Sequence, residues 1–133
     1  MDYQNLPGIS RIQAVPIEML PDNIQAKALA GVRITLLSDA QEIAFNNSSL
    51  SYERNFSSNG YAESVVLKFR SHVDLTKYKY AFVVTDVNKH RYLLGFKEYP
   101  SLRIERTKVV STSAVNIYDY QISLTAKKAL IEL

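Results

Sequence analysis

The chain contains no cysteine, and this absence alone removes three kinds of chemistry. Without thiols there is no disulfide, no thiolate-ligated metal and no cysteine nucleophile. Histidine is nearly as scarce, because only His72 and His90 occur and neither has a second histidine or a cysteine at ligand spacing. A zinc site needs three or four such ligands. We therefore expect no metal site and no cofactor, and the absence of thiols fits a reducing compartment.

Long hydrophobic runs are also absent. No stretch of the chain approaches the roughly 18 apolar residues that a membrane-spanning helix needs. The first ten residues, MDYQNLPGIS, have neither the basic start nor the apolar middle of a signal peptide. These absences predict a protein without a membrane partner that resides in the cytoplasm.

Glycine is scarce as well, and its four copies are isolated from one another, so no glycine-rich loop is present to hold a phosphate group. Residues 86–88 have the beginning of a calcium-binding pattern, but His90 takes the next ligand position and no glycine or closing glutamate follows. Asp86 and His90 flank a predicted turn, whose solvated tip offers no dry pocket for nucleophilic catalysis. The sequence therefore predicts that the protein is not an enzyme.

What is present is the composition of an ordinary globular domain. The 133 residues are 47% hydrophobic and 22% charged, values that argue against disorder of the whole chain. A chain of this length buries a substantial core without disulfides. We expect one β domain over residues 1–133, in which residues 1–20 leave two alternatives open. Residues 9–15 form either a short edge strand or part of an extended N-terminal arm that orders only against a partner.

The strongest structural signal is a predicted β-hairpin over residues 78–100, with the sequence YKYAFVVTDVNKHRYLLGFKEYP. Two runs of aromatic and β-branched residues flank a polar break, which is typical of strands joined by a turn. Both faces of the two runs are largely apolar, and Pro100 ends the second run because proline cannot donate to a ladder. Strands that are apolar on both faces belong in the middle of a fold. We therefore expect this hairpin to be central.

The turn of this hairpin has two possible lengths. A two-residue turn at residues 88–89 is the simpler one, because Asn88 tolerates a positive φ, but Lys89 stands where such a turn favours glycine. A longer loop over residues 87–90 is the alternative. The short turn predicts that three pairs of residues face each other: Asp86 and Arg91 as an exposed ion pair, Val84 and Leu93, and Phe82 and Gly95.

Other segments show the period-two alternation of half-buried strands. The stretch SSNG at residues 57–60 is the strongest turn signal and predicts a second hairpin over residues 49–70. One short helix is predicted over residues 22–30, with Gly31 as its stop. Further strands are predicted at residues 32–36, 102–110 and 118–124. Together these segments predict an all-β fold, an antiparallel β-sandwich or a partly closed β-barrel with one short helix.

Positive charge is concentrated in the second half of the chain. Residues 1–66 carry a net charge of −3 and residues 67–133 carry a net charge of +6. A basic segment lies close in sequence to the rings of Tyr92, Phe96 and Tyr99, and rings beside basic side chains bind single-stranded nucleic acid in many β modules. The basic side chains alternate between two strand faces, so no single basic face emerges. Nucleic-acid binding is therefore the alternative function, with Lys97, Arg103, Arg106 and Lys108 as its candidate residues.

The nine tyrosines and the absence of tryptophan favour a different function. Tyrosines on strands suit packed sheet surfaces and protein interfaces. Opposite net charges in the two halves of the chain favour head-to-tail contacts between copies, which close into rings or stack when they are repeated. We therefore favour a non-enzymatic structural protein that forms a homo-oligomer or joins other subunits.

The order of these signals over roughly residues 49–133 resembles uncharacterised small proteins of bacterial phages and prophages, of the tail or virion-assembly kind. The stretches that carry the resemblance are LSYERNFSSNGYAESVVLKF, YAFVVTDVNKHRYLLGF, Pro100 and the closing VNIYDYQISLTAKKALIEL. The resemblance implies a β-sandwich or barrel subunit of a tail-like particle, with other virion-type subunits as partners and no cofactor. It assigns a role to no individual residue.

Overall fold

A computed structural model describes residues 2–5, 8–20, 22–31, 34, 40–57, 60–76, 79–97, 102–111 and 116–133. Strands dominate this part of the chain. Its helical elements are a 3-10 turn, η1 (Ile17–Met19), and one short helix, α1 (Ile24–Leu29). The strands are β1 (Asp2–Asn5), β2 (Ile9–Pro16), β3 (Gln41–Ile43), β4 (Asn46–Ser57), β5 (Gly60–Ser71), β6 (Tyr80–Asp86), β7 (Arg91–Leu94), β8 (Arg103–Ser111), β9 (Asn116–Ala126) and β10 (Leu130–Glu132).

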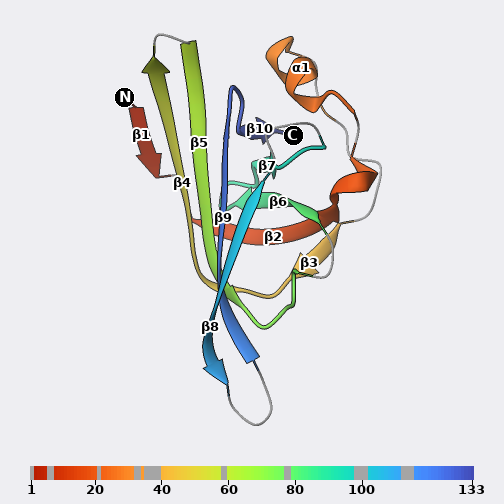
Figure 1. Cartoon of the computed structure of the whole chain (residues 1–133), viewed down its shortest axis with the longest axis vertical. Coiled ribbons are helices and arrows are strands. Elements are labelled where there is room, and N and C mark those ends of the chain that lie inside the picture. Colours follow the sequence, from red (N-terminus) through yellow and green to blue (C-terminus); the bar gives the residue numbers. More distant parts are fainter. Residues whose placement is uncertain are drawn as a thin grey trace.

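The strands form two antiparallel sheets of five strands each. Sheet A has the order β1-β4-β5-β9-β8, and sheet B has the order β10-β7-β6-β2-β3. The long strands of sheet A follow the long axis of the molecule, whereas β2 and β6 of sheet B run across it (Figure 1). Sheets whose strands cross in this way pack face to face with side chains between them. The all-β prediction is confirmed, and of its two alternatives the protein adopts the sandwich.

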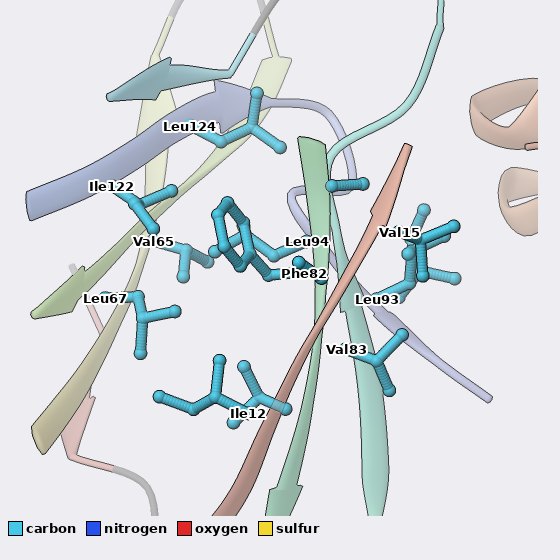
Figure 2. Close-up of a cluster of buried hydrophobic side chains, with 14 of the residues drawn as sticks. Ile12, Val15, Val65, Leu67, Phe82, Val83, Leu93, Leu94, Ile122 and Leu124 are labelled. Atoms are coloured by element: carbon cyan, nitrogen blue, oxygen red, sulfur yellow. The ribbon is translucent and has the colours of Figure 1, made fainter. Parts of the chain in front are cut away.

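The core lies between the two sheets. Val65 and Leu67 of β5 point toward Phe82 of β6, and all three side chains are fully buried (Figure 2). The ring of Phe69 joins the layers, with its centroid 6.3 Å from that of Phe82 and 5.3 Å from that of Tyr120 in β9. Period-two alternation on the long strands produces this layer, because successive side chains point to opposite faces.

The centre of sheet B is buried on both faces around β6, as predicted for the central hairpin. Val15, Val83 and Leu93 point away from sheet A, toward the side on which α1 lies, and none of these side chains is exposed (Figure 2). Leu20 and Ile24, from the segment that carries η1 and α1, belong to the same buried cluster. A sheet covered on both faces needs apolar residues at consecutive positions, which explains the unbroken run AFVV in β6.

The register of the central hairpin differs by one residue from the short-turn prediction. Phe82 pairs with Leu94, Thr85 pairs with Arg91, and the Asp86 amide donates to the His90 carbonyl at 2.9 Å. This register closes a loop of residues 87–89, so neither predicted turn length is right, although residues 87–90 do lie between the two strands. Lys89 has a φ of 67°, and a left-handed residue after a tight turn is typical of three-residue hairpin loops. Because a one-residue shift moves side chains to the opposite face, Leu94 rather than Leu93 packs with Phe82 against sheet A.

The predicted ion pair between Asp86 and Arg91 is also wrong. Asp86 is buried, and its Oδ1 accepts hydrogen bonds from the amides of Asn88 at 2.8 Å and His90 at 2.9 Å. The carboxylate therefore satisfies the backbone of the loop instead of pairing across the strands. A short polar side chain that bonds to amides a few residues ahead is a common way of stabilising a turn.

Most of the remaining predicted elements are confirmed where the structure describes them. The second hairpin is β4 and β5, closed where Ser57 pairs with Gly60, and the strands at residues 102–110 and 118–124 are β8 and β9. Residues 9–15 belong to β2, which pairs with both β6 and β3 inside sheet B, so the edge-strand prediction is wrong. Tyr78, Pro100, most of the strand predicted at residues 32–36, and the turn residues 58 and 59 lie outside the described residues.

A buried carboxylate ties the C-terminal end of the chain to sheet A. Glu63 of β5 accepts hydrogen bonds from the hydroxyl of Tyr52 at 2.6 Å, from Arg54 at 3.0 Å and from the amide of Ala129 at 3.0 Å. Only 3% of Glu63 is exposed. A buried charge is tolerated when it is paired and hydrogen-bonded in this way. Ala129 precedes β10, so Glu63 holds the chain where it crosses from sheet A to sheet B.

Candidate functional site

The four basic residues predicted to bind nucleic acid come from two parts of the fold. Arg103 and Arg106 lie on the edge strand β8 of sheet A, whereas Lys97 follows β7 of sheet B. The side chain of Lys108 lies outside the description. The structure brings Lys97 and Arg106 together in one cleft, and Arg103 does not line that cleft.

The cleft has a volume of about 500 Å³ and a lining that is more apolar than polar. It is assembled from four stretches of the chain: η1, the segment from Leu75 to the start of β6, the residues after β7, and the start of β8. Ligand sites of soluble proteins typically enclose about 300–1,000 Å³. Its apolar lining residues are Ile17, Leu75, Phe96, Leu102 and Ile104.

Three basic side chains line the same cleft, namely Lys79, Lys97 and Arg106. Lys97 Nζ lies 3.3 Å from Asp22, and Arg106 lies 3.1 Å from Asp74 with its guanidinium 4.2 Å from the centre of the Tyr118 ring. Lys79 is exposed, and its ammonium group has no ion-pair partner among the described side chains. Within the described lining, basic side chains occur without an acidic one.

A second, wider opening adjoins this cleft. It has a volume of about 720 Å³ and shares Ile17, Lys79 and Lys97 with the first cleft, while Pro16 and Glu18 complete its described lining. The two lysines therefore stand where the openings meet. Of these residues only Lys97 was a sequence candidate. Lys79 was missed because the sequence contains no signal that brings η1 and the start of β6 together.

The carboxylates beside the basic side chains and the burial of the Phe96 ring make the basic segment less suited to binding nucleic acid than its sequence indicated. Arg103 lies 2.9 Å from Glu105 on its own strand, so Lys97, Arg103 and Arg106 each have a carboxylate neighbour. The Phe96 ring, which the sequence suggested for stacking, is only 2% exposed and belongs to the core. Tyr99 lies outside the described residues. A bound phosphate would therefore have to replace existing ion pairs and would find no Phe96 ring to stack on.

A different surface is formed by the two edges of sheet A. The order β1-β4-β5-β9-β8 separates the two halves of the sequence along sheet A. One edge strand, β1, therefore comes from the first half, and the other, β8, comes from the second half. Three basic residues and one acidic residue give β8 a net charge of +2. Two acidic residues and one basic residue give β1 and β4 together a net charge of −1. The charge asymmetry of the sequence thus becomes an asymmetry between two strand edges.

Neither a metal-binding group nor a membrane-spanning helix is found in the described part of the chain. No group of three or more histidine and acidic side chains there has an arrangement that could hold a metal ion. No helix there is long and apolar enough to cross a membrane.

Comparisons with known proteins add no assignment: no protein family, no curated protein and no solved structure matches this chain.

Proposed function

We propose that this protein is a non-enzymatic structural subunit of a larger assembly, of the kind that its sequence resembles in phage and prophage tails. The observation that carries the proposal is the pair of open edges of sheet A, β1 and β8, which have opposite net charge when β4 is counted with β1. An edge strand presents a row of backbone donors and acceptors that can pair with another chain.

The charges on β8 select its partner. Charged side chains on an edge strand suppress indiscriminate pairing, so a strand such as β8 pairs best with an edge of complementary charge. In a second copy of this chain, that edge is β1 with its neighbour β4. A contact between β8 of one copy and β1 of the next uses two different surfaces, and repetition of such a contact produces a ring or a filament.

The shape of the molecule supports the same proposal. The β4–β5 hairpin and the β8–β9 hairpin extend past sheet B at opposite ends of the long axis (Figure 1). Near the end of β4, the large apolar side chain of Phe56 is 71% exposed. The projecting hairpins and the edge strands of sheet A offer a surface that a neighbouring copy would cover, and Phe56 lies on it.

The proposal is tested by measuring native mass against protein concentration, with electron microscopy of the concentrated fraction. We expect the mass to rise with concentration toward rings, tubes or a fixed oligomer, and to fall in high salt, because exposed charges are screened beyond about one Debye length. A strict monomer at every concentration would overturn the proposal.

A charge reversal on β8 tests which surface is used. Arg103 is suitable because its side chain is 76% exposed and contacts only Glu105 among the described ion pairs. We expect Arg103→Glu to shift the assembly midpoint to at least tenfold higher concentration without changing the melting temperature. The matched control is Lys68→Glu, an exposed position on β5 in the interior of the same sheet, which should assemble normally. Equal behaviour of the two variants would contradict an interface at β8.

The second candidate function is a nucleic-acid-binding β module, and it is favoured by the convergence of Lys97 and Arg106 on one cleft. The two candidate functions are distinguished by measuring how strongly the protein is retained on single-stranded DNA as the salt concentration rises. Binding that falls steeply with salt, and that is weakened when Lys97 and Arg106 are replaced by glutamine, would favour this candidate. Retention that is unchanged by these substitutions would exclude the cleft as its site.

A further inference from the structure

The cleft between η1, β6 and β8 lies beside one of the strand edges that the assembly proposal uses, because Ile104 and Arg106 of β8 belong to its lining. We propose that it binds a small amphipathic anion, a carboxylate or sulfonate attached to an apolar body. This activity is tested apart from the proposed function through Lys79, which lines the cleft and lies outside both β1 and β8.

The apolar part of such a ligand has a matching interior. Leu75 and Phe96 at the bottom of the cleft are nearly fully buried, while Ile17 and Leu102 are half-buried and therefore border its open side. A surface that is apolar inside and partly accessible gains free energy when a hydrocarbon or aromatic group displaces water from it. The volume of about 500 Å³ admits a medium-length alkyl chain or a fused aromatic ring system.

The charged part of the ligand is selected by Lys79, Lys97 and Arg106. The described lining holds these three cations and no carboxylate, while Asp22 pairs with Lys97 and Asp74 pairs with Arg106 from outside the lining. Lys79 leaves a net positive charge, which favours a negative group. Lys97 is already close to Asp22, but that contact is 3.3 Å long and the Asp22 side chain is 79% exposed. Exposed ion pairs of this kind contribute little stability, so a ligand anion can replace Asp22 at small cost.

Lys79 is the main evidence that the cleft binds a ligand. A lysine that only stabilised the folded state would have an ion-pair partner within it. Lys79 lines both adjoining openings, and its ammonium group has no ion-pair partner in the described structure. The contribution of this residue to the fold is its backbone carbonyl, which accepts a hydrogen bond from the amide of Ile17 at 3.0 Å. Replacing its side chain therefore changes the charge of the cleft and leaves the fold in place.

The test uses 8-anilinonaphthalene-1-sulfonate, a fluorescent anion with an aromatic body, titrated into the folded full-length protein. We expect saturable binding that decanoate displaces and decanol displaces at least tenfold less well. Lys79→Glu should weaken the binding of the probe at least tenfold. Lys68→Glu, an equally exposed reversal on the opposite side of sheet A, should leave it unchanged. Cooperative thermal unfolding of each variant verifies that the probe is reporting on a folded protein.

The position of the ligand is checked by following backbone amide signals in nuclear magnetic resonance spectra during the decanoate titration. Shifts concentrated at Thr76, Lys79 and Leu102 would support the cleft. Shifts centred on the exposed Phe56 would overturn the proposal, as would equal competition by decanol and decanoate or an unchanged affinity in Lys79→Glu. Because these variants leave β8 and β1 intact, failure here is distinguishable from failure of the assembly proposal.

Discussion

At the scale of single residues, Lys89 is the clearest conflict between side chain and backbone. Its φ of 67° lies in the left-handed region, which costs an L-residue other than glycine, asparagine or aspartate about 1–2 kcal/mol. The loop tolerates this because Asp86 bonds to the amides of Asn88 and His90 and so holds the turn. The hairpin therefore keeps its shape at the expense of stability.

We predict that Lys89→Gly raises the free energy of unfolding by about 0.5–1 kcal/mol, since the relief of strain exceeds the entropy that glycine adds to the unfolded chain. Chemical denaturation measures the change. The control is Asn88→Gly, at a position without a positive φ, which should lower stability by a similar amount. A loss of stability in both variants would show that Lys89 is not strained.

At the scale of elements, Glu63 joins the β4–β5 hairpin to the start of β10, and Tyr52 is the partner that makes this junction sensitive to pH. Burial raises the pKa of the Tyr52 hydroxyl above its usual value of 10.0, and the hydrogen bond to Glu63 raises that pKa further. Arg54 opposes this effect, because its hydrogen bond and positive charge lower the Tyr52 pKa. The protonated hydroxyl is thus the form that the folded state prefers.

A group with a raised pKa in the folded state stabilises the fold below its unfolded pKa and loses that contribution as the pH rises through the folded value. We predict that the protein is more stable than Tyr52→Phe at pH 8, and that the difference shrinks as the pH rises above about 10. Denaturant midpoints measured from pH 8 to 11.5 for both proteins give this difference. A constant difference across the range would contradict the role assigned to the hydroxyl.

At the scale of the whole molecule, the sequence was sufficient to predict the strands and the sandwich but not the contacts between distant segments. Alternation in β4, β5 and β9 predicted the buried faces, because a strand with one covered face needs apolar residues at every second position. The register of β6 and β7 was missed because a lysine at the left-handed position gives no turn signal. Likewise, nothing in the order of residues indicates that Glu63 meets Ala129 across 66 positions.

The candidate cleft was predicted only in part, for the same reason. Lys97 and Arg106 were found because they are basic residues close in sequence, and both line the cleft. Lys79 and Ile17 joined them only through tertiary packing, in which the Ile17 amide bonds to the Lys79 carbonyl at the start of β6. Local patterns predict which residues form an element, whereas a cleft depends on how elements from four stretches of the chain meet.

The assembly proposal makes its sharpest prediction for the strand β1, which among the described strands pairs with β4 alone and lies at the edge of sheet A. We expect a chain that lacks residues 1–5 to remain folded, because the described core begins at β2, and to stay monomeric at concentrations at which the full chain assembles. If β8 of one copy meets β1 of the next, adding Arg103→Glu to the shortened chain has no further effect, since both changes remove the same contact. Light scattering of the four proteins, full and shortened with either residue at position 103, completes the cycle. Independent, additive losses of assembly would show that β1 and β8 do not contact each other.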